Sequence, residues 1–215
     1  MIGRFLAAAK DRPIFILLAG PNGSGKSTFR EKRLLRLGLN CIDPDEVALD
    51  MFGRQAKTRD EARAATIEAT EQIRIHFMRR ESVCLETVFS DTKGHKKALV
   101  EEARASGYFT SMFFVGVDTP EVSIARISQR VIDGGHDIPD NIISDRFPRA
   151  FENAKSMLLF VDLALLFDNT GCYSDDSQPS RHVHIATIAG GKLVESGDAR
   201  PAWFTQYGFD VAAGL

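Results

Sequence analysis

Residues 20–28 read GPNGSGKST, and they follow the apolar run IFILLA at residues 14–19. A buried parallel strand, a glycine-rich turn and the start of a helix form the context in which this pattern binds phosphate. The glycines allow the backbone to turn its N–H groups toward a polyphosphate. The stretch therefore predicts a nucleotide-binding phosphate loop made of Gly20, Pro21, Asn22, Gly23, Ser24, Gly25, Lys26, Ser27 and Thr28.

Two side chains of the phosphate loop have the chemistry that ATP and Mg²⁺ require. Lys26 can reach the β- and γ-phosphates, and Ser27 supplies a hydroxyl ligand for Mg²⁺. A helix that starts near Lys26 would point its positive dipole end at the same anion. The alternative is a glycine-rich turn without a ligand, which requires all of these features to coincide by chance. We therefore expect ATP and Mg²⁺ as cofactors.

The composition fits one α/β domain over residues 1–215, because 44% hydrophobic residues can form one core. A net charge of -2 gives no global basic field, so we expect no nucleic-acid partner. Cys41, Cys84 and Cys172 have a spacing that matches neither a disulfide framework nor a zinc cluster. The N-terminal apolar stretch is too short for a signal peptide, and no later run has the length of a membrane span. We expect a soluble cytoplasmic protein that does not bind membranes.

Apolar runs alternate with helical patterns along the chain, which is typical of a parallel sheet covered by helices. The expected strands cover residues 14–19, 40–43, 82–86, 110–117 and 163–167. The expected helices cover residues 27–37, 58–80, 93–106, 120–133 and 140–159. Residues 181–195 alternate around Gly190 and Gly191, which predicts a hairpin. The predicted fold class is α/β, with a parallel sheet, helices on both faces and a C-terminal antiparallel edge hairpin.

Acidic side chains follow the second expected strand, at the edge of the sheet where ligands bind in such folds. The order Asp43-Pro44-Asp45-Glu46 brings several carboxylates to this edge. A carboxylate there can accept the proton of a hydroxyl that attacks a γ-phosphate, and we assign this role to Asp45. Asp43 is then a helix cap or part of the metal shell. The alternative is that Asp43 or Asp45 only caps a helix that begins near Glu46.

Polar residues also follow the third and the last expected parallel strands. Glu86 ends an apolar strand, where an unpaired charge would be costly, so we expect it to meet a ligand, Mg²⁺ or an arginine. The alternative is a solvated strand end. Asn169 and Thr170 either touch an adenine base or form a turn.

Residues 126–149 carry four arginines around a Gly134-Gly135 turn. Arg126 and Arg130 are four residues apart and therefore share one face of a helix. Two helices joined by a flexible turn could close over the phosphates as a lid, where guanidinium groups neutralise charge during phosphoryl transfer. The alternative is a solvated helical hairpin. The candidate clamp comprises Arg126, Arg130, Arg146 and Arg149, whereas we assign a structural role to His136.

An ordered set of segments resembles the zeta toxin family of P-loop kinases, in its short, stand-alone branch. The segments are GPNGSGKST, IDPDEVA, LETVFS, RVIDGGHDIPDNIISDRFPRAFENAK and LLFDNTG, and the resemblance covers about residues 12–195. It implies a P-loop kinase-like fold that uses ATP and Mg²⁺ to phosphorylate the sugar 3′-hydroxyl of UDP-N-acetylglucosamine. In the longer toxins this reaction poisons cell-wall synthesis, and a small antitoxin protein blocks the nucleotide site. The resemblance thus implies a sugar-nucleotide substrate and an antitoxin partner.

The resemblance also implies roles for individual residues. Lys26 and Ser27 match the phosphate and metal ligands, and Asp45 matches the acidic residue that activates the sugar hydroxyl. Glu86 and Thr87 match the strand end that contacts the sugar nucleotide.

The resemblance also implies two clamp arginines and one acidic residue, and for two of these positions it leaves two candidates. Arg130 matches the first phosphate-clamping arginine, and the second is Arg146 or Arg149. A substrate-side acidic residue on the helix before the third strand matches Glu68 or Glu71. The substrate-binding set is then Asp45, Glu71, Glu86, Thr87 and Arg126. Residues 46–66 lack a match to the sugar-binding insert of the long toxins, which bears on the substrate more than on the phosphate chemistry.

Other functions share parts of this pattern. Transporter ATPases have the same loop but also need a serine-glycine-rich signature and a distant acidic strand end, which do not occur in this sequence. A kinase for a nucleoside, gluconate or another small molecule needs largely the same parts. A nucleotide-dependent switch would bind ATP without transferring phosphate, and it would have no need of Asp45 or the arginines.

Overall fold

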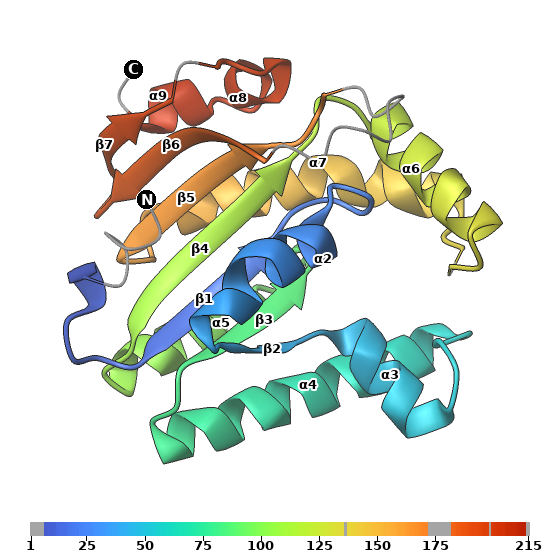
Figure 1. The fold of residues 1–215 in the computed structure, drawn as a ribbon, viewed down its shortest axis with the longest axis horizontal. Helices are drawn as coiled ribbons and strands as arrows, with labels where there is room; N and C mark the ends of the chain where they lie inside the picture. Colours follow the sequence, from blue (N-terminus) through green and yellow to red (C-terminus); the bar gives the residue numbers. More distant parts are fainter. Residues whose placement is uncertain (1–6, 136, 172–181, 198, 214–215) are drawn as a thin grey trace.

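The structure of the chain, a computed structural model, describes residues 7–135, 137–171, 182–197 and 199–213. Its strands are β1 (Ile14–Ala19), β2 (Asn40–Ile42), β3 (Val83–Thr87), β4 (Phe109–Gly116), β5 (Leu163–Asp168), β6 (Val183–Ala189) and β7 (Lys192–Ser196). They form one sheet in the order β2-β3-β1-β4-β5-β6-β7 (Figure 1). The strands from β2 to β5 in this order are parallel, and β6 and β7 extend the sheet antiparallel. The expected fold class, including the edge hairpin, is confirmed.

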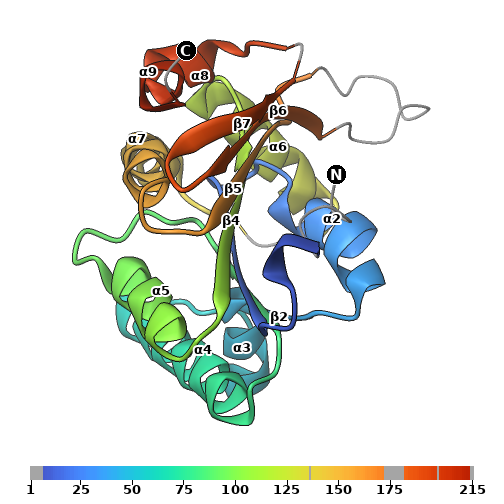
Figure 2. The ribbon, with the colours of Figure 1, turned by 90° about the vertical axis from the view of Figure 1, so that its left-hand side faces the viewer.

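Helices cover both faces of the sheet (Figure 2). They are α2 (Lys26–Phe29), α3 (Pro44–Phe52), α4 (Arg59–Arg79), α5 (His95–Ala105), α6 (Pro120–Ile132), α7 (Asp140–Met157), α8 (Ala202–Gln206) and α9 (Phe209–Ala213). α2 lies on one face, and α4, α5 and α7 lie on the other. Within the described ranges, no helix combines the length and apolar character needed to cross a membrane.

Alternate residues of the central strand point into two separate apolar layers. Ile16 and Leu18 of β1 pack in the layer that contains Phe29. Phe15 packs in the other layer, where its ring meets the ring of Phe77 of α4 edge-on at 5.2 Å. Because strand side chains alternate between faces, a strand covered on both faces must be apolar throughout. This requirement accounts for the composition of IFILLA.

The strand order places the site at one edge of the sheet. β1 pairs with β3 on one side and with β4 on the other, so the order reverses direction beside β1. Ligands of open α/β sheets bind outside the carboxyl ends of the strands at such a reversal. The loops after β1, β2, β3 and β5 all open toward this edge, because these strands are parallel.

Short helices are the main difference from the sequence-based expectation. The expected strands and long helices are present, with ends shifted by one or two residues. The helix expected at residues 27–37 is instead α2 followed by a π-helical segment (Arg30–Leu34) and a 3-10 turn (Leu35–Leu37). α8 and α9 were not expected as elements, and α3 was named only as a helix that begins near Glu46. They have between five and nine residues, too few for a helical period to emerge from sequence.

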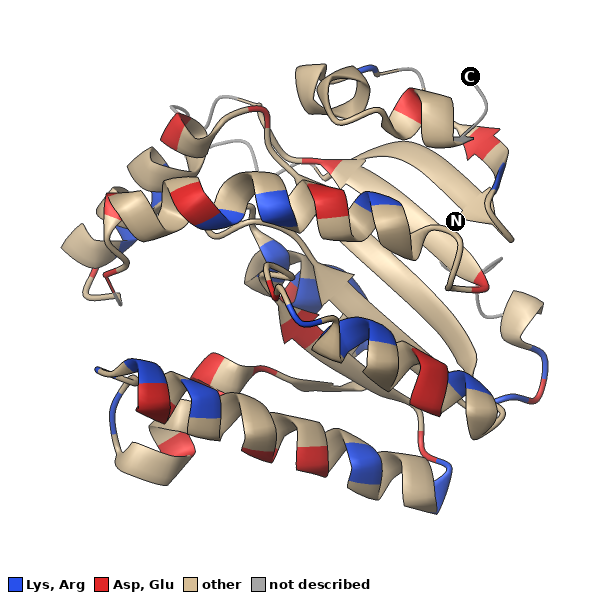
Figure 3. Cartoon of the chain, turned by 180° about the vertical axis from the view of Figure 1, so that it is seen from behind, with Lys and Arg blue, Asp and Glu red and all other residues tan. Residues whose placement is uncertain are grey.

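Charged residues of both signs are interspersed along the outer surfaces of α4, α5 and α7 (Figure 3). Arg74 of α4, for example, donates to Glu102 of α5 at 3.0 Å. This mixed surface agrees with the small net charge of the sequence. Cys172 and His136 lie outside the described residues.

Candidate active site

The glycines of the phosphate loop are required by the close approach of neighbouring main chain. A Cβ atom on Gly20 would lie 2.2 Å from the carbonyl oxygen of Val115, and one on Gly23 would lie 2.7 Å from that of Ser123. Gly25 has a φ of 91° directly before α2, a left-handed conformation that favours glycine. The glycine spacing therefore follows from local space and backbone conformation.

Lys26 is buried at the start of α2. Its ammonium group donates to the carbonyl oxygen of Pro21 at 2.9 Å. Burial lowers the pKa of Lys26, and the charges of Glu86, Asp43 and Asp45 act in the opposite direction. The loop lysine thus lies in the field of the carboxylates that follow β2 and β3.

A cavity of about 470 Å³ lies between the phosphate loop and the ends of the neighbouring strands. Its walls combine ammonium, guanidinium, carboxylate and hydroxyl groups. Of the residues singled out from the sequence, the cavity is lined by Gly23, Gly25, Lys26, Ser27, Thr28, Asp43, Asp45, Glu86, Thr87, Arg126, Arg130 and Asn169. The other assigned loop residues are buried and do not line the cavity. They are Gly20, Pro21, Asn22 and Ser24.

Arg30 is a buried residue of this site that the sequence did not single out. Its guanidinium lies 3.7 Å from Asp43 Oδ2 and 3.6 Å from Glu86 Oε2, and it donates to Glu46. The other carboxylate oxygen of Glu86 accepts a hydrogen bond from Ser27 Oγ at 2.8 Å. One arginine therefore gathers the carboxylates that follow β2 and β3. Its position one helical turn after Lys26 is the only sequence signal that could have indicated it.

The two aspartates after β2 have different surroundings. Asp43 accepts a hydrogen bond from the backbone N–H of Asp45 at 2.9 Å and caps α3, which has Pro44 in its first turn. Burial raises the pKa of Asp43 to about 7, and the charge of Glu86 adds to this effect. Asp45 lies in the first turn of α3 and lines the cavity. The cap role, one of the two roles expected for Asp43, is therefore present.

The oxygen atoms around Ser27 fit a magnesium ion. Its hydroxyl and the carboxylate of Glu86 are hard oxygen ligands, and Glu86 Oε2 is buried without a hydrogen-bond donor. In the part of the chain that the structure describes, no group of three His, Cys, Asp or Glu side chains could hold a metal by itself. A small set of protein oxygens suits Mg²⁺, which usually keeps waters and phosphate oxygens as its remaining ligands.

Arg126 of α6 lines the cavity but also binds the main chain. Its guanidinium donates to the carbonyl oxygens of Gly23 at 3.3 Å, Asn169 at 2.6 Å and Gly171 at 3.4 Å. Arg126 therefore joins α6 to the phosphate loop and to the segment after β5.

Arg130 lies one turn further along α6 and also lines the cavity. The glycine turn expected to act as a hinge packs against it, because a Cβ atom on Gly135 would lie 2.6 Å from Arg130 Cγ. Gly134 has a φ of 87°, which favours glycine.

The two arginines of α7 have different surroundings. Burial lowers the pKa of Arg146, followed by the charge of Arg149, while the charge of Asp45 acts in the opposite direction. Arg149 donates to Asp145 at 2.6 Å and lines a second cavity of about 330 Å³ beside the β3–α5 loop. Neither arginine lines the main cavity. Arg146 is the one that interacts electrostatically with Asp45.

The two acidic residues of α4 assigned from the sequence do not line the cavity. Glu71 is exposed and forms an ion pair with Arg74 at 2.6 Å, and Glu68 is exposed and accepts from Gln72 at 3.2 Å. The residue of α4 that lines the cavity is Thr66. A helix rotates about 100° per residue, so the difference of register decides which side chain faces the site.

Two residues that lie between β5 and β6 in the sequence contact the phosphate loop. The amide of Asn169 donates to the carbonyl oxygen of Ser24 at 2.7 Å, and Nε2 of His182 lies 3.1 Å from that of Gly25. Asn169 was expected to touch adenine or form a turn, and Thr170 does form a turn with the side chain two residues before it. His182 was not singled out, because a histidine directly before a strand, here β6, has no motif around it.

Comparison with known proteins agrees with this geometry. A sequence model described as zeta toxin matches residues 4–184. An uncharacterized protein of Haemophilus influenzae is 26% identical over 151 residues, which are 68% of this chain and the whole of that protein.

Solved structures with a similar fold include chains of AvrRxo1-ORF1:ORF2 and of a chromosomal toxin-antitoxin system. The AvrRxo1-ORF1:ORF2 complex with ATP contains a chain with a TM-score of 0.61 and 15% identity, over 88% of this chain and 62% of that one. The PezAT chromosomal toxin-antitoxin system of Streptococcus pneumoniae contains one with a TM-score of 0.53 and 16% identity, over 84% of this chain and 81% of that one. The present chain thus spans less than two thirds of the AvrRxo1 chain, and both likenesses concern the fold.

Proposed function

This chain belongs to the zeta toxin family, and we propose that it is a kinase that transfers the γ-phosphate of ATP to a hydroxyl of a sugar nucleotide similar to UDP-N-acetylglucosamine. The observation that carries the proposal is that Lys26, at the start of α2, and Asp45, in the first turn of α3, line one cavity. A phosphate-binding lysine facing a carboxylate across a cavity is the arrangement that phosphoryl transfer to a hydroxyl needs. The similar AvrRxo1 complex with ATP supports the choice of nucleotide.

In the proposed reaction, the acceptor hydroxyl binds between Asp45 and the γ-phosphate. Asp45 takes the hydroxyl proton as the oxygen attacks the γ-phosphorus, and ADP leaves. Lys26 and the N–H groups of the phosphate loop hold the phosphates. Arg130 and Arg146 supply positive charge where negative charge develops.

Magnesium has a defined part in this proposal. Ser27 and Glu86 would hold the ion, and Mg²⁺ would neutralise phosphate charge when it is bound. Glu86 is already oriented for this by Arg30 and by the hydroxyl of Ser27.

The family supports the choice of phosphate acceptor and of protein partner in this proposal. Glu86, Thr87 and Thr66 line the cavity. In this proposal, their carboxylate and hydroxyl groups face the sugar ring of the acceptor. The similar PezAT proteins form a toxin-antitoxin system, so we also propose a small antitoxin partner. We further propose that residues 1–215 act as one kinase domain in the cytoplasm, where ATP is available.

Replacement of Asp45 tests the function. Asp45→Asn keeps the shape of the side chain but removes the proton acceptor, so we expect near-normal ATP binding with transfer reduced by roughly 10²-fold or more. Transfer to UDP-N-acetylglucosamine is measured with radiolabelled ATP, and ATP binding is measured by calorimetry. Lys26→Ala serves as a comparison, because it should weaken ATP binding as well as transfer.

The outcome also separates the alternatives. Transfer at the parent rate by Asp45→Asn would contradict the mechanism. Transfer to a different hydroxyl compound that depends on Asp45 would indicate a kinase for another small molecule. ATP binding without transfer to any acceptor of a broad panel would indicate a switch protein.

A further inference from the structure

Three consecutive carbonyl groups of the phosphate loop accept hydrogen bonds from side chains of distant elements. Arg126 of α6 donates to Gly23, Asn169 after β5 donates to Ser24, and His182 before β6 contacts Gly25. These donors are 103, 145 and 157 residues away from their partners along the chain. The contacts therefore arise from the tertiary structure and have no counterpart in the loop motif.

The direction of these carbonyl groups fixes the direction of the phosphate-binding N–H groups. A trans peptide is planar, so its C=O and N–H bonds point in opposite directions. The Ser24 carbonyl shares its peptide with the Gly25 N–H, and the Gly25 carbonyl shares its peptide with that of Lys26. The hydrogen bond from Asn169 therefore fixes the direction of the Gly25 N–H. His182 reinforces the direction of the Lys26 N–H, because the Gly25 carbonyl also accepts from the backbone N–H of Phe29 at 3.0 Å. Gly25 and Lys26 both line the cavity.

We propose that Arg126, Asn169 and His182 are positioning residues, here called the carbonyl brace, which hold the phosphate loop in its nucleotide-binding conformation before the nucleotide arrives. This inference rests on the proposed function only in taking the loop as the nucleotide site. A loop that is already ordered loses less conformational entropy on binding, so the brace strengthens nucleotide affinity. Arg126 and Asn169 also line the cavity, whereas His182 does not, so a change at His182 tests the effect of the brace on the loop alone.

Each member of the brace is itself held in place. The backbone N–H of Asn169 donates to Gly116 at 2.9 Å, and its carbonyl oxygen accepts from Arg126 at 2.6 Å. Arg126 therefore holds the loop both directly and through Asn169. Gly25 has no room for a side chain, because a Cβ atom there would lie 2.4 Å from the amide nitrogen of Asn169.

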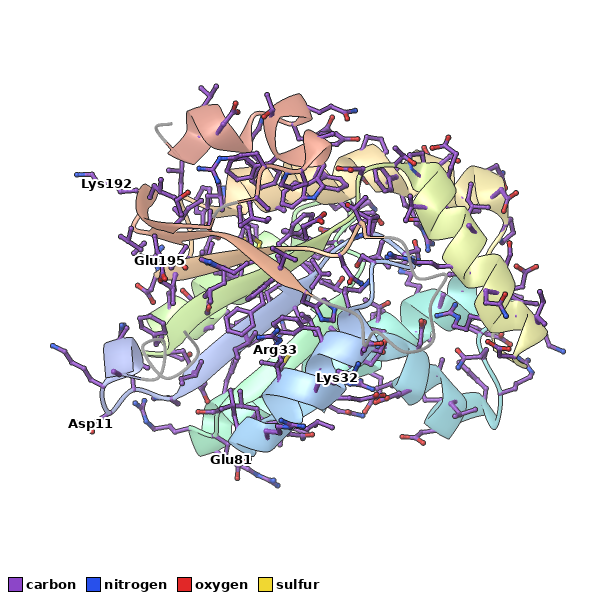
Figure 4. The ribbon with its side chains drawn as sticks, turned by 45° about the horizontal axis from the view of Figure 1, so that its top comes forward. Asp11, Lys32, Arg33, Glu81, Lys192 and Glu195 are labelled. Carbon is purple, nitrogen blue, oxygen red and sulfur yellow. The ribbon has the colours of Figure 1, made fainter. Side chains whose placement is uncertain are left out.

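His182 is buried against the helical segment that follows the phosphate loop. Its ring meets Phe29 edge-on at 5.1 Å, and Arg33 donates to its carbonyl oxygen at 3.5 Å. Arg33 lies on this segment next to Lys32 (Figure 4). Burial lowers the pKa of His182 to about 4, so the ring is neutral at neutral pH. A neutral ring facing a carbonyl oxygen donates from Nε2, because only that tautomer makes the hydrogen bond.

Paired variants of His182 test whether the donor itself matters. His182→Gln keeps an N–H donor, whereas His182→Phe keeps a ring against Phe29 and removes the donor. We expect the dissociation constant of MgATP, measured by calorimetry, to rise about 10-fold in His182→Phe and less than about 3-fold in His182→Gln. Asn169→Ala should behave like His182→Phe. Without nucleotide, amide exchange at Gly25 and Lys26 should be faster in both weakened variants.

Asn153 offers a matched control. Its amide donates to the carbonyl oxygens of Phe89 and Asp91 at 2.8 and 3.0 Å, so it holds the β3–α5 loop as Asn169 holds the phosphate loop. Asn153→Ala should leave MgATP affinity unchanged at a comparable melting temperature. Equal affinity in His182→Phe and the parent, or an equal loss in Asn153→Ala, would overturn the brace. Normal MgATP binding by a parent that transfers phosphate to no acceptor would overturn the proposed function and leave the brace standing.

Discussion

At the scale of single residues, the acidic loop after β2 divides two tasks between two aspartates. Asp43 is half-buried, caps α3 and lies beside Arg30. Arg30 also pairs with Glu46 and Glu86, so one guanidinium serves three carboxylates. Burial, followed by the charge of Glu86, raises the pKa of Asp43 to about 7. Asp45 lies in the cavity and remains the proposed base.

The raised pKa of Asp43 predicts a pH-dependent stability. A carboxyl whose folded pKa of about 7 exceeds its ordinary 3.8 favours folding when protonated. Its contribution is fully present below about pH 4 and is lost as the pH rises through 7. Asp43→Asn cannot ionise and still caps α3, so at pH 8 we expect it to be more stable than the parent by about 2–4 kcal/mol, with the difference shrinking toward pH 4. Urea unfolding at several pH values measures this.

An exposed aspartate of the same helix provides the control for this measurement. Asp50→Asn should change the free energy of unfolding by less than about 0.5 kcal/mol at every pH, because the side chain is on the surface of α3. Parallel pH curves for Asp43→Asn and the parent would show that Asp43 ionises normally in the folded chain.

At the scale of elements, α6 and α7 present arginines to different surroundings. Arg126, in the middle of α6, is bound to the main chain of the phosphate loop, so any closing motion must involve the residues that follow it. Arg130 lines the cavity from the next turn of α6. On α7, Arg146 interacts with the charge of Asp45, whereas Arg149 pairs with Asp145 beside the second cavity. The proposed clamp is therefore Arg130 with Arg146.

Single alanine variants distinguish the arginines. Arg130→Ala and Arg146→Ala should each lower the transfer rate by roughly 10²-fold and ATP affinity by much less, because the charge that they meet grows in the transition state. Arg149→Ala should lower the rate by less than about 3-fold, since its surface ion pair with Asp145 contributes little. Rate and affinity are measured separately, by transfer at saturating ATP and by calorimetry. A loss confined to ATP affinity in Arg130→Ala would make it an ordinary ground-state phosphate ligand.

At the scale of the whole molecule, the C-terminal helices α8 and α9 complete the core and reach the loops of the site. Trp203 of α8 is fully buried, and its indole N–H donates to Asp168 at 2.9 Å. Its backbone N–H donates to Asp118 at 3.2 Å. Gly116 has no space for a side chain, since a Cβ atom would lie 2.5 Å from the indole ring. Trp203 thus supports the ends of β4 and β5, directly before Asn169.

Removal of the indole ring predicts a large loss of stability. Trp203→Ala should lower the free energy of unfolding by about 3–5 kcal/mol, because it leaves a cavity and removes the indole hydrogen bond to Asp168. Val211→Ala on α9 is the comparison, since Val211 is exposed and its truncation should change stability by less than about 0.5 kcal/mol. Chemical denaturation of both variants gives these values. Similar stabilities of the two variants would mean that α8 is dispensable for the core.

The sequence by itself determined the features that depend on neighbouring residues. The phosphate loop, the apolar strands and the long helices could be predicted because glycine spacing and hydrophobic period are local properties. The positions of Asp45 and Glu86 at the rim also followed, because residues after parallel strands reach the same edge of the sheet. The family resemblance added the kinase-like fold, which the comparisons confirmed.

Only the tertiary structure decided which side chains meet. It placed Thr66 at the cavity in place of Glu68 or Glu71, and it gathered three carboxylates on Arg30. The first outcome depends on a helix rotation of about 100° per residue, which a sequence pattern with errors of one or two residues does not resolve. The second depends on which elements lie next to one another. His182 and Gly25 meet across 157 residues because β6 joins the sheet beside β5, and no local pattern encodes that contact.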